Sequence, residues 1–174
     1  MEATLSLLEE RGYVGLSFAA VATRAGTTKP AIYRRWASKR DLVLEAVFRT
    51  QGDDVVANTG DLDADMRTMV RWSLEKLGSA VGRAALAGLL AEPPGTVGAP
   101  TDQLAHVWRR MDQRFGEAIA KGEIREDLDT TSLIIMHAGP AMLATALYGE
   151  AAVNDAWVER IAGMILDGVR VQER

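Results

Sequence analysis

Apolar side chains recur every three or four residues through most of the chain, which is the pattern of amphipathic helices. The clearest stripe consists of Leu104, Val107, Trp108, Met111, Phe115 and Ile119. No alternating polar and apolar run and no Asn-Gly turn indicates a strand or a hairpin. The chain of 174 residues is therefore predicted to be all-α, with about nine helices and no internal repeat.

Capping residues and helix breakers set the expected boundaries. Helices are expected over residues 1–11, 18–26, 28–36, 39–51, 66–80, 81–91, 101–121, 131–149 and 155–171. Gly12 is expected to stop the first helix, and Thr101 to cap the seventh. Residues 92–100 hold three of the five prolines and are expected to form a loop.

The second and third helices have the features of two short helices joined by a tight turn. Ser17 and Thr28 can cap them, and Gly26 can adopt the left-handed conformation that ends the first of the two. Ala22 is small enough for close helix packing, and Ile32 can enter a shared core. The pattern predicts a helix-turn-helix.

The residues of the later helix of this pair divide into two faces at 100° per residue. Ile32 and Trp36 are expected to face the core, whereas Pro30, Ala31 and Arg34 face outward. Small outward residues let the backbone approach the floor of a DNA groove, where Arg34 can bind a guanine edge. Lys29, Tyr33 and Arg35 flank this face, where phosphates would lie.

Charge is distributed unevenly along the chain. The net charge is −4, yet residues 24–40 hold six cations and no acid. Acidic residues outnumber basic ones from Thr101 onward. This asymmetry is typical of a basic DNA-binding region joined to an acidic body.

The run from Ser17 to Val47 resembles the N-terminal domain of the TetR (tetracycline repressor) family of transcriptional regulators. The matching positions are Ser17, Gly26, Lys29, Ile32, Tyr33, Trp36, Ser38 and Lys39. Pro30 stands where the family often has Gly, and Ala37 where it often has Pro. The resemblance implies a helix-turn-helix domain over residues 1–50, an effector-binding and dimerisation domain over 51–174, and repression of transcription.

The expected DNA contacts combine the outward face of the recognition helix with the positions that match the family. They are Ser17, Thr27, Thr28, Lys29, Pro30, Ala31, Tyr33, Arg34, Arg35 and Lys39. Lys39 opens the fourth helix, where it could either reach a phosphate or be solvated. Family members usually carry several more residues before the first helix, so no contact from an N-terminal arm is assigned.

The last two helices are more apolar than surface helices with a single buried stripe. A homodimer would bury them in a four-helix bundle and present two recognition helices to a palindromic operator. The expected interface residues are Ile134, Ala138, Ala141, Met142, Thr145, Trp157, Ile161 and Ile165. The alternative is a single-chain core with these helices in its middle.

Large, soft side chains are abundant in the middle of the chain and suit a pocket for a small, apolar effector. The candidate lining is Met69, Trp72, Trp108, Met111, Phe115, Met136, His137 and Met142. An effector that binds better when the two DNA-binding heads are spread apart would release the operator. The alternative for each of these residues is an ordinary place in the core.

Other classes of protein fit the sequence less well. It contains no cysteine, no phosphate-binding glycine loop, no nucleophile elbow and no histidine pair at metal-ligand spacing. Neither catalysis nor a metal or other cofactor is therefore expected. A protein-interaction adaptor that keeps the helix-turn-helix as a scaffold remains an alternative. No signal segment and no run of about 18 apolar residues is present, so a cytoplasmic protein without a membrane partner is expected.

Overall fold

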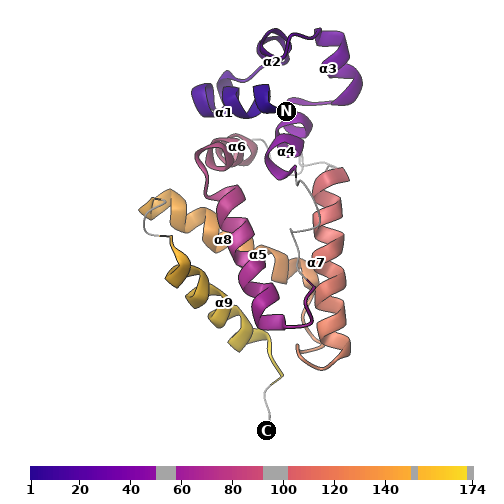
Figure 1. The fold of residues 1–174 in the computed structure, drawn as a ribbon, viewed down its shortest axis with the longest axis vertical. Coiled ribbons are helices and arrows are strands. Elements are labelled where there is room, and N and C mark those ends of the chain that lie inside the picture. The colour runs from indigo at the N-terminus through magenta and orange to yellow at the C-terminus, as the bar shows by residue number, and fades with distance from the viewer. Residues whose placement is uncertain (50–57, 92–101, 150–152, 172–174) are drawn as a thin grey trace. The chain divides into compact units, whose positions relative to one another are not determined.

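The computed structural model describes residues 1–49, 58–91, 102–149 and 153–171, with the side chains of 102–104 left out (Figure 1). These residues form nine α-helices and no strand, apart from an isolated antiparallel bridge between Ile124 and Arg170. The helices are α1 (Glu2–Gly15), α2 (Phe18–Arg24), α3 (Lys29–Arg35), α4 (Lys39–Phe48), α5 (Leu62–Leu77), α6 (Ala80–Leu90), α7 (Asp102–Ala120), α8 (Thr130–Tyr148) and α9 (Asp155–Val169). The all-α prediction is confirmed.

Two helices extend beyond the bounds expected from the sequence. Gly12 breaks the helical backbone of α1 with φ 65° and ψ −178°, but another turn follows and α1 ends at Gly15. α5 begins at Leu62 rather than at Met66, because the Asp61 side chain accepts hydrogen bonds from the first backbone N–H groups of the helix. The predicted loop at 92–100, the cap Thr101 and the end of the fourth helix at residue 51 lie outside the described residues.

The chain divides into two compact units, each made of two sequence segments. The first unit comprises Met1–Arg49 and Ser79–Leu104, and the second comprises Thr50–Gly78 and Ala105–Arg174. The predicted domain boundary after residue 50 falls outside the described residues. α6 falls within the C-terminal domain that the sequence predicts, yet it packs against α1 and α4 in the first unit.

The contact between α6 and α1 depends on a glycine. A Cβ atom at Gly88 would lie 2.0 Å from Cγ of Tyr13, far inside van der Waals contact. The Tyr13 side chain is buried and occupies the space that this glycine leaves. The approach of α6 to the helix-turn-helix region therefore requires glycine at residue 88.

The second unit has one continuous apolar core. α5 packs against α8 and α9, and α7 completes the cluster (Figure 1). The core side chains include Met66, Met69, Val70, Val107, Met111, Phe115, Leu133, Val158, Ile165 and Leu166. Burial of apolar surface in such a cluster makes the largest favourable contribution to the folding free energy of a helical domain.

An ion pair inside this unit joins α5 to α7. Nε of Arg114 donates to Oδ2 of Asp65 at 2.6 Å, and both side chains are fully buried. The second Asp65 oxygen accepts hydrogen bonds from the backbone N–H and the hydroxyl of Thr59. Losing one member would leave the other as an unpaired buried charge, so the pair fixes how α5 and α7 pack.

Candidate functional site

Local capping and one glycine build the turn between α2 and α3. Oγ of Ser17 accepts the N–H of Ala20 at the start of α2, and Oγ1 of Thr28 caps α3 in the same way. Gly26 has φ 60°, a left-handed conformation that glycine adopts without strain. These features confirm the predicted helix-turn-helix geometry.

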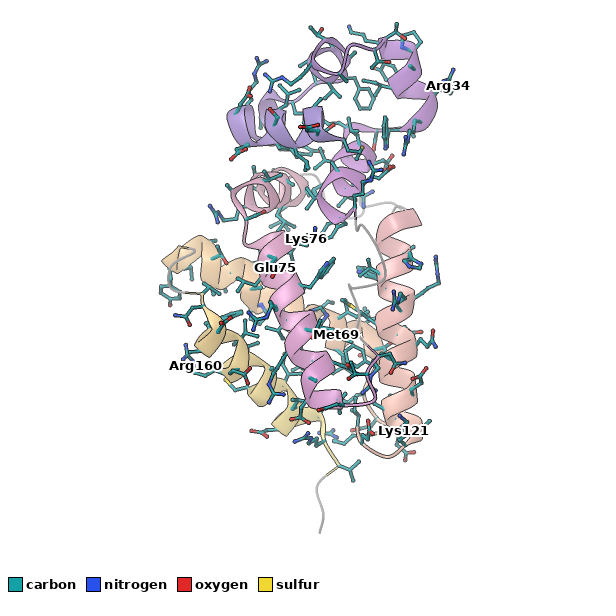
Figure 2. The ribbon with its side chains drawn as sticks, viewed as in Figure 1. Arg34, Met69, Glu75, Lys76, Lys121 and Arg160 are labelled. Atoms are coloured by element: carbon teal, nitrogen blue, oxygen red, sulfur yellow. The ribbon has the colours of Figure 1, made fainter. Side chains whose placement is uncertain are left out.

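α3 keeps one residue in the core and exposes most of the others. Ile32 is 3% exposed, whereas Lys29, Pro30, Tyr33, Arg34 and Arg35 are exposed and Ala31 is half-buried. Figure 2 shows Arg34 extending outward from α3. The predicted division of the helix into a core face and an outward face is therefore confirmed for Ile32 and Arg34.

Tyr33 combines an anchored ring with an exposed position. Its ring packs edge-on against Phe18 of α2, with centroids 4.7 Å apart and an angle of 81° between the planes. Tyr33 is nevertheless 60% exposed. The aromatic contact restricts the ring, so the phenol is held at the flank of the outward face of α3.

Glu45 of α4 binds the C-terminal end of α3 through two hydrogen bonds. Its carboxylate accepts from Nη2 of Arg35 at 2.9 Å and from Nε1 of Trp36 at 2.7 Å. Trp36 has extended backbone angles and caps α3 rather than continuing it. Arg35, expected from the sequence to lie at a phosphate, thus has a carboxylate partner within the protein.

Lys39 also has a partner within the first unit. Its ammonium group donates to the carbonyl oxygen of Tyr13 at 3.0 Å and lies 4.2 Å from the centre of the Tyr13 ring. The interaction ties the first turn of α4 to α1 and satisfies a carbonyl near the end of α1. Sequence reasoning missed it, because the two residues are 26 positions apart.

Arg24 is the third cation of this region with an internal partner. Nη1 and Nη2 donate to the two carboxylate oxygens of Glu10 at 2.5 and 2.7 Å, and Nη1 also reaches Oγ of Ser6. The hydrogen bonds from Arg24 lower the pKa of Glu10 and raise that of Arg24 itself. Both groups are therefore fully charged at neutral pH.

Two cations of the basic run are left without a partner in the described part of the chain. Arg24, Arg35 and Lys39 have the partners named above, and Arg40 lies 3.8 Å from Asp41. No hydrogen bond or ion pair of the Lys29 or Arg34 side chain is found within the described ranges. The structure thus distinguishes these two residues, both exposed on α3, from the other four.

The residues expected to line an effector pocket occupy different environments in the second unit. Met69, Met111, Phe115 and His137 are fully buried, and Trp72 packs against the apolar core. Met142 is half-buried, whereas Trp108 and Met136 are 40% and 43% exposed. Figure 2 labels Met69 on α5, the helix that supplies several core residues.

The residues expected at a dimer interface are largely buried by the single chain. Ile134, Ala141, Thr145 and Ile165 are all less than 9% exposed, and Trp157 and Ile161 pack against the core. Ala138 and Met142 are half-buried. The large apolar side chains that α8 and α9 leave exposed are instead Ile135, Met136, Leu143, Leu147, Tyr148 and Met164.

The described residues hold no group of three His, Asp or Glu side chains that could bind a metal ion. The candidate site is therefore the capped helix-turn-helix, with two exposed cations on α3 that have no side-chain partner among the described residues. Such an arrangement suits binding to the phosphates and base edges of a duplex.

Comparisons with known proteins agree with this geometry. Residues 1–46 match the family described as bacterial regulatory proteins, tetR family, and residues 56–165 match the tetracyclin repressor-like C-terminal domain. The HTH-type transcriptional regulator YdeS of Bacillus subtilis, itself uncharacterized, is 27% identical over 98% of this chain and 87% of its own length.

Solved structures have the same fold. The TetR family transcription regulator SCO0332 is 28% identical, with a TM-score of 0.69 over 97% of this chain and 95% of that chain. FadR from Bacillus subtilis, crystallised with stearoyl-CoA, is 15% identical with a TM-score of 0.68 over 97% of each chain, which shows the fold alone. Since the C-terminal family match by itself spans more than half of the sequence, this chain belongs to the TetR family of DNA-binding transcriptional regulators.

Proposed function

We propose that the chain is a homodimeric, cytoplasmic repressor that binds a near-palindromic operator in double-stranded DNA and is released by a small, largely apolar effector. The observation that carries the proposal is the pair of exposed cations on α3, Lys29 and Arg34, which have no partner within the described residues. Cations that the protein leaves unpaired on a recognition helix are available to phosphates and guanine edges.

The residues of the helix-turn-helix take different roles in this proposal. Arg34 reads a base edge, while Lys29 and the Tyr33 phenol bind phosphates on the flanks. Pro30 and Ala31 allow close approach, and the Ser17, Thr27 and Thr28 hydroxyls donate to phosphates. Arg35 and Lys39 act chiefly by fixing α3 and α4, through Glu45 and Tyr13 respectively.

A second copy of the chain covers the exposed apolar side chains of α8 and α9. Among the described residues, α8 is the one helix long and apolar enough, by length and composition, to cross a membrane. In a transcriptional regulator, such a face is better matched to a partner helix, because an exposed apolar patch favours association. The proposed interface therefore centres on Leu143, Leu147 and Met164 rather than on the more buried Ile134 and Ala141.

The second unit is the proposed effector-binding body. Its core contains several methionines, whose flexible side chains can rearrange around a ligand. The structural neighbour FadR was crystallised with stearoyl-CoA, which supports a partly apolar ligand for this fold. A coupling free energy of about 2 kcal/mol between effector and operator would change DNA affinity about thirtyfold.

Binding of the full-length protein to a random duplex over a range of salt concentrations tests the DNA-binding face. The slope of log affinity against log salt concentration is negative. Lys29→Ala should reduce its magnitude by about one for each copy bound. Lys121→Ala, which changes an exposed lysine directly after the C-terminal end of α7 (Figure 2), is the matched control and should leave the slope unchanged. Failure to retain duplex DNA at low salt would favour the adaptor alternative.

A further inference from the structure

A buried polar pair interrupts the apolar contact between α5 and α8. Oγ of Ser73 lies 2.8 Å from Nδ1 of His137, and the two residues are 0% and 1% exposed. One turn earlier on each helix, Met69 and Leu133 belong to the apolar core. The hydrogen bond therefore lies beside apolar core side chains of both helices.

The hydroxyl of Ser73 has one acceptor within the described residues, and it is Nδ1 of His137. Thr68 and Thr145, on the same two helices, instead donate to the carbonyl oxygen four residues earlier. If Nδ1 carried the proton, both the Ser73 hydroxyl hydrogen and the Nε2 lone pair would be buried without a partner. Donation by Ser73 leaves one unsatisfied group rather than two, which assigns the histidine proton to Nε2.

Burial supports a neutral ring. It lowers the pKa of His137 to about 4, so the imidazole is uncharged at physiological pH. A neutral ring with an acceptor at Nδ1 has a single N–H donor, at Nε2. That atom is buried and has no hydrogen-bond partner in the part of the chain that the structure describes.

A buried donor without an acceptor is costly, and native proteins rarely keep one. An apolar pair at these two positions would remove the cost without opening the helix contact. We propose that His137 is the polar anchor of the effector site, and that the effector presents an uncharged carbonyl oxygen to Nε2–H. This inference rests on the proposed effector-controlled function and adds the chemistry of the ligand.

The choice of an uncharged carbonyl follows from the charges of the surrounding core. Nε of Arg114, a fully buried cation of the second unit, already has Asp65 as its partner at 2.6 Å, and Nη1 lies 3.9 Å from Glu123, although neither Nη atom makes a hydrogen bond among the described residues. A ligand carboxylate at His137 would need a counter-charge that the neutral imidazole does not supply. A ketone or ester oxygen on an apolar skeleton satisfies the donor without that requirement, while Met69 can shift to accommodate the skeleton.

The two histidines of the sequence make a direct test by nitrogen NMR practical. In the full-length protein labelled with ¹⁵N-histidine, His137 should show a proton on Nε2 and a hydrogen-bonded, unprotonated Nδ1. Exposed His106 serves as the internal reference for a solvated ring. A proton on Nδ1 of His137 would overturn the inference without any ligand being added.

Matched pairs of small compounds test the ligand chemistry. Acetophenone and ethylbenzene, and benzophenone and diphenylmethane, differ only by a carbonyl in place of a methylene group. At least one ketone should shift the Nε2–H resonance of His137 and bind about tenfold more tightly than its hydrocarbon, as expected for satisfying a buried donor. His137→Phe, which keeps an aromatic ring, should remove that preference.

The inference is overturned if no ketone shifts the Nε2–H resonance, or if ketone and hydrocarbon bind equally well to the unaltered protein. Retention of duplex DNA by the same sample reports on the proposed function separately. A protein that retains DNA but shows no carbonyl preference refutes only the anchor. A protein that shows the preference but ignores DNA refutes only the repressor proposal.

Discussion

The exposed faces of α3 and α8 differ in what they leave unsatisfied. α3 exposes charge, and two of its cations have no partner among the described residues. α8 exposes apolar side chains such as Leu143 and Leu147, which are 58% and 64% exposed. Unpaired charge is complementary to a polyanion, whereas exposed apolar area is complementary to another apolar face. The same chain thus carries two binding surfaces with opposite chemistry, and each can be disrupted separately.

The charged face should respond most strongly to loss of Arg34. Arg34→Ala should weaken operator binding by about 2–6 kcal/mol over two half-sites and relax base preference at one position in each. Arg35→Ala is the matched control, because Arg35 is paired with Glu45 and should affect all sequences alike. Competition binding against single-base operator variants measures both effects. Equal loss of base preference in the two variants would refute the reading role of Arg34.

A charge placed on the exposed apolar face of α8 should weaken the dimer. Leu143→Glu should weaken self-association by about 3–5 kcal/mol, because the carboxylate would be desolvated without a partner. Sedimentation equilibrium measures the dimer dissociation constant. Val14→Glu, at a 90% exposed position of α1, should leave the dimer intact. An unchanged dimer in Leu143→Glu would place the interface elsewhere.

His137 should make the protein sensitive to acid. Its folded-state pKa of about 4 lies below the ordinary value of 6.5, so the unfolded chain binds a proton between these pH values that the folded chain does not. Its stabilising contribution is complete above pH 6.5 and is lost as pH falls toward 4, by up to about 3 kcal/mol.

Urea unfolding across this pH range, compared between the unaltered protein and His137→Gln, isolates that contribution. The variant should lose less stability on acidification than the parent, and His106→Gln, at an exposed position, is the matched control. Identical pH dependence of the unfolding free energy in all three proteins would contradict the lowered pKa of His137.

The smallest expected effect concerns the packing of α6 on α1. Gly88→Ala places a methyl group against Tyr13 and should destabilise the protein by about 1–3 kcal/mol. Gly116→Ala, also within a helix but with nothing near the added Cβ, should instead stabilise slightly. The midpoint temperatures of thermal unfolding should therefore shift in opposite directions for the two variants. An unchanged midpoint for Gly88→Ala would show that the contact with Tyr13 is not tight.

The sequence predicted the features of the DNA-binding region that local chemistry determines. Gly26 and the caps Ser17 and Thr28 act on residues within a few positions, so their roles could be inferred without a structure. The core position of Ile32 followed from helical periodicity.

Partners far apart in sequence could not be predicted in this way. Arg35 and Lys39 look like further phosphate ligands in the sequence, but Glu45 and Tyr13 engage them in the fold. Periodicity also failed to orient α8, because that helix is apolar on nearly every side. Residues such as Ala141 and Thr145, expected from the sequence at a dimer interface, face the interior of the single chain.

Selection of bound sequences from a pool of random duplexes tests the central claim most directly. Two copies of α3 in a twofold dimer should enrich a near-palindromic site whose half-sites are separated by about one helical turn, roughly 10 base pairs, or a multiple of it. Each half-site should contain a guanine whose selection disappears with Arg34→Ala. Enrichment of an unrepeated site, or of no sequence at all in low salt, would contradict DNA recognition by two α3 helices of a twofold dimer.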